Sequence, residues 1–280
     1  MVPATSANAP WGRRYIARIA TAPPEPAFRI DVRFLGGLSD TQRAAFETAA
    51  GRWEQILSAD VPSVVIRGET IDDVRIDAAG ERIDGPGRIL GSAGPVDLRP
   101  GSFIPATGLM SFDSADLARM ESDGSLVTVI VHEMGHVLGF GTLFPRRRLV
   151  IGFGGPDPQF IGENAAREYA ALRGPGARPR SVPLANVGGP GTRDGHWREA
   201  VFANELMTGL HNAGANPISR VTIGAFEDLG YSVDYTAADE YRLPTATELL
   251  TLKRARAERG HACMIEIPEQ RVLPDSAIVH

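Results

Sequence analysis

Residues 132 to 136 read His-Glu-Met-Gly-His, and this segment carries the clearest chemical signal in the chain. On an α-helix, residues four positions apart lie on one face, so His132 and His136 can place two imidazole nitrogens on a single metal ion. Glu133 would then lie beside the metal, where a carboxylate can act as a general base. The alternatives are a pair of solvated surface histidines and a structural metal site, which does not need the interposed glutamate. The motif therefore favours a catalytic zinc site.

The residues around this motif indicate a helix that is buried on most of its faces. Thr128, His132 and His136 recur at four-residue spacing, and the positions between them are mostly apolar. The β-branched run at 127–131 favours a strand by propensity, and we expect tertiary packing to override it. Gly139 predicts the end of the helix, because glycine readily adopts the left-handed conformation.

A third zinc ligand has to come from elsewhere in the chain. A catalytic zinc usually has three protein ligands and one open position, so a further His, Asp or Glu is needed. In the compact metzincin spacing, the third histidine would stand at position 142, which is Thr. The histidines that remain are His196, His211, His261 and His280.

Two segments together resemble a known family. HEMGHVLGF at 132–140 and GGPGTRDGHWREAVFANELMTGL at 188–210 are similar to the leishmanolysin-type zinc metallopeptidases, specifically the bacterial relatives in that metzincin group. In that family an insertion separates the helix glycine from the third zinc-binding histidine, and a methionine in a tight turn follows that histidine. The resemblance implies zinc ligands at His132, His136 and His196, a general base at Glu133 and the Met-turn residue at Met207.

Other assignments stay open when the residues are taken alone. His211 is the fallback for the third ligand. A glutamate ligand, Glu163 or Glu168, would indicate a gluzincin-like aminopeptidase instead, and Gly139 argues against that reading. A metal held only for stability would make the chain a non-catalytic binding protein.

The resemblance covers roughly residues 28 to 236 and implies an α+β fold of metzincin type. We expect a mixed twisted sheet with the active-site helix in an upper lobe, a mainly helical or irregular lower lobe, and zinc in the cleft between them. The expected divisions are a proline-rich N-terminal arm at 1–27, a catalytic domain at 28–236 with upper lobe 28–141, insertion 142–195 and lower lobe 196–236, and a C-terminal extension at 237–280.

Sequence periodicity and capping signals predict the individual elements. For the first part of the chain they predict a strand at 28–34, a helix from a capping box at Ser39 and Gln42 to about Leu57, and strands near 64–67 and 74–78. For the later part they predict a helix at 162–172, a helix at 221–229 that ends at Gly230, and a strand at 231–235. A last helix is predicted from a capping box at Thr245 and Glu248 to about Glu258, with Gly260 as its stop.

The segment 108–112 has two interpretations of equal weight. It is either an inner strand or, by resemblance to metzincins, the edge strand above the cleft. An exposed edge offers unpaired amide and carbonyl groups to an extended peptide, which could then align with the metal.

Composition narrows the class of protein. A chain of 280 residues with 43% hydrophobic residues can bury a sizeable core, and a net charge of −5 does not indicate nucleic-acid binding. The single cysteine, Cys263, allows no internal disulfide. No apolar run approaches the length of a membrane span, and the first residues lack the order of a signal peptide. The resemblance implies a secreted or cell-surface protein, and the sequence does not indicate an oligomeric state.

Peptide-bond hydrolysis is the expected reaction, with a polypeptide as substrate. Zinc lowers the pKa of a coordinated water toward about 7 and polarises the scissile carbonyl. Glu133 accepts the proton of the water and passes it to the leaving amine. Because imidazoles bind metal in their neutral form, we expect zinc and activity to be lost in mild acid.

Overall fold

The computed structural model describes residues 27–83, 85, 91–189, 192–210, 214–257 and 265–279. The expected N-terminal arm lies outside these residues except for its last position. His211, His261, Cys263, His280 and the helix stop expected at Gly260 also lie outside them.

The main sheet has the strand order β1-β4-β6-β5-β10, and β11 also pairs with β5. These strands are β1 Ile30–Gly36, β4 Val74–Glu81, β5 Gly91–Leu98, β6 Pro105–Asp113, β10 Ile265–Glu266 and β11 Arg271–Val272. Strands β1, β4 and β6 run parallel, β5 runs antiparallel to β6, and β10 and β11 run parallel to β5. The chain is thus of mixed α and β structure, as expected.

Helix α1 (Asp40–Glu54) links the parallel strands β1 and β4, so the expected β-α-β start is confirmed. Its N-terminus has the capping box expected from Ser39 and Gln42. The helix ends at Glu54, three residues before the expected end, although the residues that follow stay buried.

The segment 108–112 lies inside the sheet, so the edge-strand interpretation is wrong. Met110 of β6 faces Ala78 of β4 on one side and Ala93 of β5 on the other. The strand outside it is β5, which sequence analysis did not predict, because Gly94 and Pro95 are unfavourable inside a strand. Pro95 is tolerated because β5 has only short partners on its outer side.

The other elements are smaller or lie in the second half of the chain. They are the hairpin β2 Val64–Ile66 and β3 Glu69–Ile71, helices α2 Ser114–Asp123, α3 Leu126–Val137, α4 Glu163–Leu172, α5 Glu199–Phe202, α6 Arg220–Leu229 and α7 Ala246–Ala257, strands β7 Val150–Ile151, β8 Gln159–Phe160 and β9 Val182–Pro183, and the 3-10 turns Tyr235–Ala237 and Asp275–Ala277. The helices expected at 162–172, at 221–229 and after Thr245 are confirmed.

The strand expected at 231–235 is wrong. Only one bridge forms there, between Val233 and Leu57, and a 3-10 turn begins at Tyr235. The alternation of apolar residues arises because Tyr231 is buried under α3, where its hydroxyl donates to the Leu138 carbonyl at 3.0 Å.

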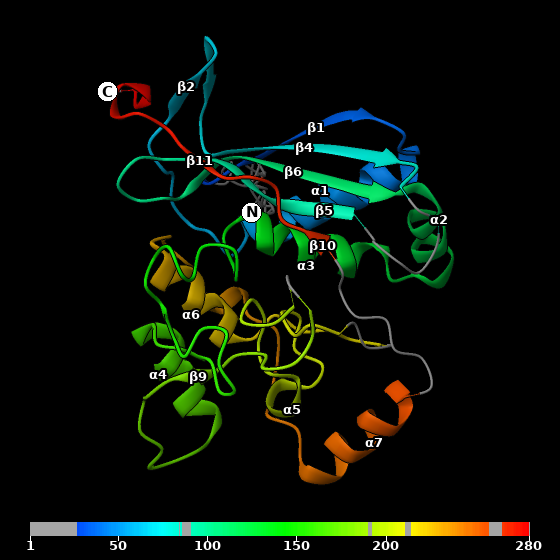
Figure 1. The fold of residues 1–280 in the computed structure, drawn as a ribbon, viewed down its shortest axis with the longest axis vertical. Helices are drawn as coiled ribbons and strands as arrows, with labels where there is room; N and C mark the ends of the chain where they lie inside the picture. The colour runs from blue at the N-terminus through cyan, green and yellow to red at the C-terminus, as the bar shows by residue number, and fades with distance from the viewer. Residues whose placement is uncertain are drawn as a thin grey trace, which may run out of the picture.

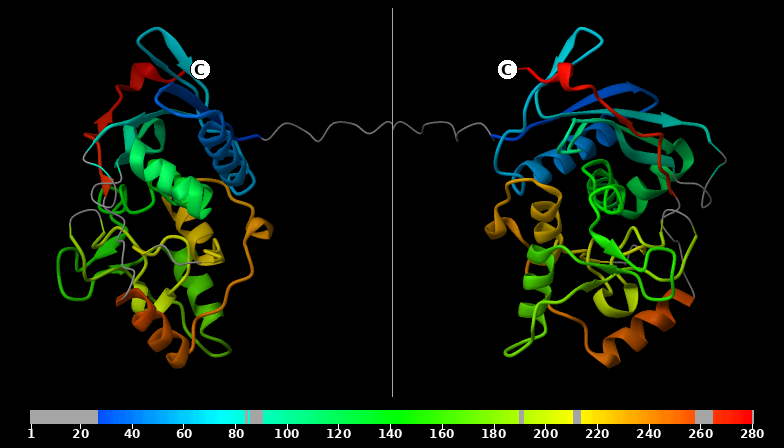
Figure 2. Two further views of the ribbon diagram at one scale, coloured as in Figure 1. Left: turned by 90° about the vertical axis from the view of Figure 1, so that its right-hand side faces the viewer. Right: turned by 60° about the vertical axis from the view of Figure 1, so that its left-hand side comes forward.

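Figures 1 and 2 show the sheet with α1, α2 and α3 in one half of the molecule and α4 to α7 in the other. Helix α3 lies under the sheet beside α1, on the side that faces the second half (Figure 1). One hydrophobic cluster runs through both halves, from Phe46 of α1 to Phe226 of α6. Among the described residues, no helix is long and apolar enough to cross a bilayer.

Candidate metal centre

Helix α3 carries His132, Glu133 and His136 on a buried segment. His132 and Glu133 are completely buried, and His136 is 6% exposed. The helix packs against α1 and β5, and the Trp53 indole of α1 donates to the Val131 carbonyl at 2.9 Å. This packing stabilises a helix where the β-branched residues by themselves favour a strand.

The chain turns after α3 at Gly139, where the expected end of the helix is confirmed. The φ angle of Gly139 is +114°, in the region that favours glycine. A β-carbon at this position would also lie only 2.9 Å from a methyl carbon of Leu143. Both the backbone conformation and the close packing therefore require glycine.

This turn brings Gly141 against Gly195, the residue before His196. The φ angle of Gly141 is +72°, and a β-carbon there would overlap the Gly195 carbonyl oxygen. The segment that carries His196 thus approaches the end of α3 at backbone distance.

The Nε2 atoms of the three histidines converge on one point. The His132 and His136 nitrogens are 3.0 Å apart, His136 and His196 are 3.0 Å apart, and His132 and His196 are 3.1 Å apart. Among the described residues, these three side chains form the group able to hold a metal ion, and all three are buried.

Each ring is fixed from its other nitrogen by a backbone carbonyl. Nδ1 of His132 donates to the Leu206 carbonyl at 2.7 Å, and Nδ1 of His136 donates to the Phe140 carbonyl at 2.8 Å. Nδ1 of His196 donates to the Thr192 carbonyl at 2.9 Å. A carbonyl only accepts, so Nδ1 holds the proton and each Nε2 presents its lone pair to the other two. Three lone pairs at this separation repel one another, and a cation bonded to all three removes the repulsion. Zinc, which takes imidazole nitrogens at about 2.0–2.1 Å, fits this donor set.

Burial keeps the imidazole of His136 neutral. Loss of hydration lowers the pKa of His136 from its ordinary value to about 4, and the hydrogen bond with Phe140 opposes this only in part. A neutral ring is the form that binds a metal at physiological pH. Thr142, at the position of the compact third ligand, instead donates its hydroxyl to the His136 carbonyl at 2.8 Å.

Met207 packs against helix α3 at Gly135. Its side chain is completely buried, with Cε 3.0 Å and Sδ 3.1 Å from the place where a β-carbon of Gly135 would stand. Its carbonyl accepts a hydrogen bond at 2.9 Å from the amide of Trp197, next to His196. Met207 therefore lies beside the segments that carry all three histidines.

Glu205 is a buried residue near this centre that sequence analysis did not single out. Its carboxylate accepts hydrogen bonds from Met207, Ser219 and Thr222. Burial raises the pKa of Glu205, and these hydrogen bonds oppose the rise. The sequence shows only that an acidic residue stands directly before Leu206 and Met207.

The two glutamates considered as alternative ligands do not join the histidines. Glu163 is exposed at the start of α4, and Glu168 pairs with Arg220 at 2.7 Å and with Arg167 at 3.2 Å. His211 lies outside the described residues.

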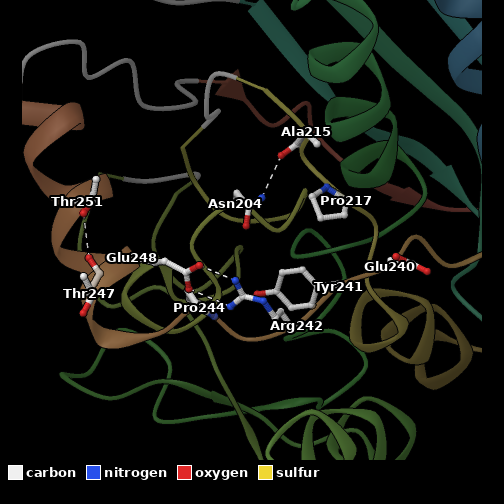
Figure 3. Close-up of a pocket in the computed structure, with 10 residues that line it drawn as sticks. All are labelled: Asn204, Ala215, Pro217, Glu240, Tyr241, Arg242, Pro244, Thr247, Glu248 and Thr251. Atoms are coloured by element: carbon white, nitrogen blue, oxygen red, sulfur yellow. Dashed lines mark hydrogen bonds and ion pairs between the residues drawn. The ribbon is translucent and has the colours of Figure 1, made fainter.

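A separate pocket of about 530 Å³ lies between α7 and the chain that precedes it, and Figure 3 shows the residues that line it. Arg242 and Glu248 point toward each other there and form an ion pair. None of the three histidines lines this pocket. It is therefore distinct from the metal centre.

Two known proteins are similar in sequence to part of this chain. A leishmanolysin homolog from Crithidia fasciculata is 30% identical over 142 residues, which is 48% of this chain and 21% of that protein. Leishmanolysin from Leishmania donovani is 28% identical over 143 residues, which is 49% of this chain and 24% of that protein. The matched part thus spans less than a quarter of the length of either relative.

The family model described as leishmanolysin matches residues 100–248, which contain the three histidines, Glu133 and Met207. This match begins later and ends later than the resemblance noted in the sequence, and it covers more than half of the chain. The protein therefore belongs to the leishmanolysin family of metallopeptidases.

Proposed function

We propose that this chain is a zinc-dependent endopeptidase with His132, His136 and His196 as metal ligands. The observation that supports this most strongly is the triangle of Nε2 atoms at 3.0–3.1 Å. Each ring donates its Nδ1 proton to a carbonyl, so the protein itself selects the tautomer that a metal needs. When bound, zinc supplies a Lewis acid that polarises a carbonyl and acidifies a coordinated water.

Glu133 is the proposed general base. It follows His132 on α3 and is completely buried, so bulk water does not compete for its carboxylate. In this role it accepts a proton from the attacking water and returns that proton to the leaving amine. Such a group contributes about 10²- to 10⁴-fold to the rate.

The proposed architecture follows the metzincin arrangement, with zinc between an upper lobe at 28–141 and a lower lobe at 196–236. Residues 142–195 form the insertion between them, and residues 237–280 the C-terminal extension. Met207, whose thioether lies under Gly135, serves as the Met-turn residue in this proposal.

Metal content and cleavage, measured on the same preparations, test the proposal. We expect wild-type protein to bind one zinc ion and to cleave an unfolded polypeptide internally. Glu133→Gln should keep the zinc and lose about 10²- to 10⁴-fold in kcat. His196→Ala should lose the zinc as well as the cleavage.

Glu168→Gln is the matched control, because Glu168 is a buried glutamate whose partners are arginines. It should keep both zinc and cleavage, whereas loss of zinc in this variant would favour a gluzincin-like site. Zinc binding without any cleavage would indicate a non-catalytic metal protein. Release of single N-terminal residues, in place of internal fragments, would indicate an aminopeptidase.

A further inference from the structure

We infer that Glu205 is a positioning residue that holds the Met207 turn against the metal-binding histidines. The inference rests on the proposed metal site. Glu205 is completely buried and stands two residues before Met207. Burying a carboxylate is costly unless hydrogen bonds compensate, so the partners of this group are informative.

The two oxygens of the carboxylate join the turn to helix α6. Oε2 accepts the amide hydrogen of Met207 at 2.7 Å. Oε1 accepts from the amide of Ser219 at 3.0 Å, from the Ser219 hydroxyl at 2.8 Å and from the Thr222 hydroxyl at 2.5 Å. Ser219 is the N-cap of α6, where the helix dipole favours a negative charge.

The turn fixed in this way contacts the metal centre at three points. The Leu206 carbonyl accepts the Nδ1 proton of His132 at 2.7 Å. The Met207 thioether packs on Gly135, the residue before His136. The Met207 carbonyl accepts a hydrogen bond from the amide of Trp197, next to His196. A shift of the 205–207 backbone would therefore move the carbonyl that orients His132 and loosen the support of His196.

A carboxylate is the group that these donors require. Each of its oxygens faces at least one donor, so both oxygens must accept. In Glu205→Gln, either orientation of the amide directs its NH₂ group at another donor. The substitution keeps the size of the side chain but breaks either the Met207 contact or the contacts with α6.

The affinity for zinc and the visible spectrum of the cobalt(II) form test this role. We expect Glu205→Gln to bind zinc about 10- to 100-fold more weakly, as is common when a group that orients a ligand is lost. The cobalt band should also shift in energy, which a loss of stability alone does not cause. Glu168→Gln, the buried control, should change neither quantity.

Ser219→Ala removes the hydroxyl donor at 2.8 Å and leaves the carboxylate and the Ser219 amide donor in place, so it serves if Glu205→Gln does not fold. It should weaken zinc binding in the same direction by a smaller factor. Unchanged affinity and an unchanged cobalt spectrum in the folded variants would overturn the inference while leaving the proposed function intact. Wild-type protein that binds no metal would overturn both.

An independent observation concerns the C-terminal segment 265–279, which lies along the outer side of β5 (Figure 1). Strand β10 pairs with Gly91 and Ser92, and β11 pairs with Asp97 and Leu98. Between these two points, the described residues 267–270 form no ladder with β5, and Pro268 has no amide hydrogen to donate.

This part of β5 lies beside the end of the metal-binding helix. A β-carbon on Gly108 would overlap Val137, the residue after His136, and would lie 3.2 Å from the Gly94 carbonyl oxygen. Pro268 covers Gly94, with its Cδ 2.9 Å from the place of a β-carbon. Gln270 donates to the Thr142 carbonyl at 3.4 Å, which is a long hydrogen bond.

The two ends of the segment are held unequally. At the far end, Arg271 forms an ion pair with the buried Asp97. Leu273 is 7% exposed and belongs to a small apolar cluster with Val64. The Val279 amide donates to the Ser63 carbonyl at 2.9 Å. At the near end, the contacts of the described residues are the two β10 backbone pairs, the side chains of Ile267 and Pro268 on Gly94, and the long Gln270 hydrogen bond.

We propose that residues 265–270 form a strap that must leave the β5 edge before a polypeptide substrate can pair with it. Residues 271–279 stay anchored when the strap opens. An extended substrate adds to a free strand edge through backbone hydrogen bonds, and antiparallel pairing is slightly more stable than the parallel pairing of the strap. This proposal also rests on the proposed peptidase function.

Full-length Pro268→Ala/Gln270→Ala tests the strap, with Glu269→Gln as a control on an exposed neighbour. We expect faster amide exchange at 91–94, which the strap pairs with or covers, and a KM for polypeptide several-fold lower, with kcat unchanged. Faster exchange without a lower KM, or exchange that does not change, would overturn the strap. A wild-type protein that is inert with zinc bound would refute the peptidase function, whereas the exchange data would still report whether the segment covers β5.

Discussion

The thioether of Met207 lies against Gly135, the residue of α3 directly before His136. A β-carbon at position 135 would stand 3.0 Å from Met207 Cε, 3.1 Å from Met207 Sδ and 3.1 Å from a ring carbon of Trp53. Such distances are shorter than ordinary van der Waals contacts, so a side chain at position 135 would have to displace Met207 or Trp53.

We therefore expect Gly135→Ala to weaken zinc binding and to destabilise the protein by about 1–3 kcal/mol, the usual cost of overpacking a core. The matched control is Gly51→Ala in α1, where a β-carbon has no neighbour within 4 Å. That substitution should stabilise the protein by about 0.5–1 kcal/mol through helix propensity. Urea unfolding and zinc titration of both variants measure the contrast, and equal effects at the two glycines would contradict the packing argument.

Local signals in the sequence predicted the helices that carry or support the site. The capping box at Ser39 and Gln42 and the glycine ends at Gly139 and Gly230 depend on residues close in sequence, so they can be read directly. The spacing of His132 and His136 has the same local character. His196 is different, because 60 residues separate it from His136. Its place near the helix depends on the contact of Gly141 with Gly195, which no spacing rule contains. The family resemblance and the glycine-rich approach at 188–191 indicated this histidine.

Long-range pairing accounts for most of what the sequence did not predict. Strand β5 contains Gly94 and Pro95, and its outer partners come from the C-terminal segment, as the pairing of Asp97 with Arg271 shows. The donors to Glu205 include groups 14 and 17 positions away, in Ser219 and Thr222. Local propensity cannot reveal such contacts, since they form only when the chain is folded.

Arg99 is a buried cation that joins separate segments of the first half of the chain. It is 1% exposed, and its guanidinium donates to the carbonyls of Pro62 at 2.6 Å, Pro105 at 2.5 Å and Asp73 at 2.6 Å. Burial lowers the pKa of Arg99. Replacement by Met would leave several buried carbonyls without a donor, so we expect a loss of about 3 kcal/mol or more in the free energy of unfolding.

Arg33→Met is the comparison for this prediction. The side chain of Arg33 is 47% exposed and pairs with Asp77 at 2.6 Å. An exposed pair contributes about 0–1 kcal/mol, so urea unfolding should give a much smaller loss than for Arg99→Met. Zinc affinity should be unchanged in both variants. Similar losses of stability would indicate that Arg99 does not hold these segments together.

Asp228 of α6 caps the neighbouring helix α4. Its carboxylate accepts the amide hydrogens of Asn164 and Ala165, each at 3.0 Å, while Gly162, the N-cap of α4, has no side chain to do so. Asp228→Ala should therefore destabilise the protein by about 1–2 kcal/mol, the usual cost of losing a cap. Adding Gly162→Ser should not restore the cap, because a β-carbon at position 162 would also lie 2.5 Å from a ring carbon of Phe160, which stays in place when Asp228 is replaced. Thermal unfolding of Asp228→Ala and of the double variant checks this, and a rescue by serine would contradict it.

The metal-free protein should lose stability as the pH falls from about 6.5 toward 4. Burial lowers the pKa of His136 in the folded state to about 4, whereas the unfolded chain has the ordinary value of 6.5. Between these values the unfolded state binds more protons, so acid favours unfolding, and above pH 6.5 this group adds no pH dependence. The difference of 2.5 pKa units corresponds to a loss on the order of 3 kcal/mol in the free energy of unfolding at pH 4.

Urea unfolding in the presence of a chelator, from pH 4 to 7.5, measures how the free energy of unfolding changes with pH. His136→Asn removes the titrating group and should flatten the curve over this range, whereas an unchanged slope would assign the acid sensitivity to other residues.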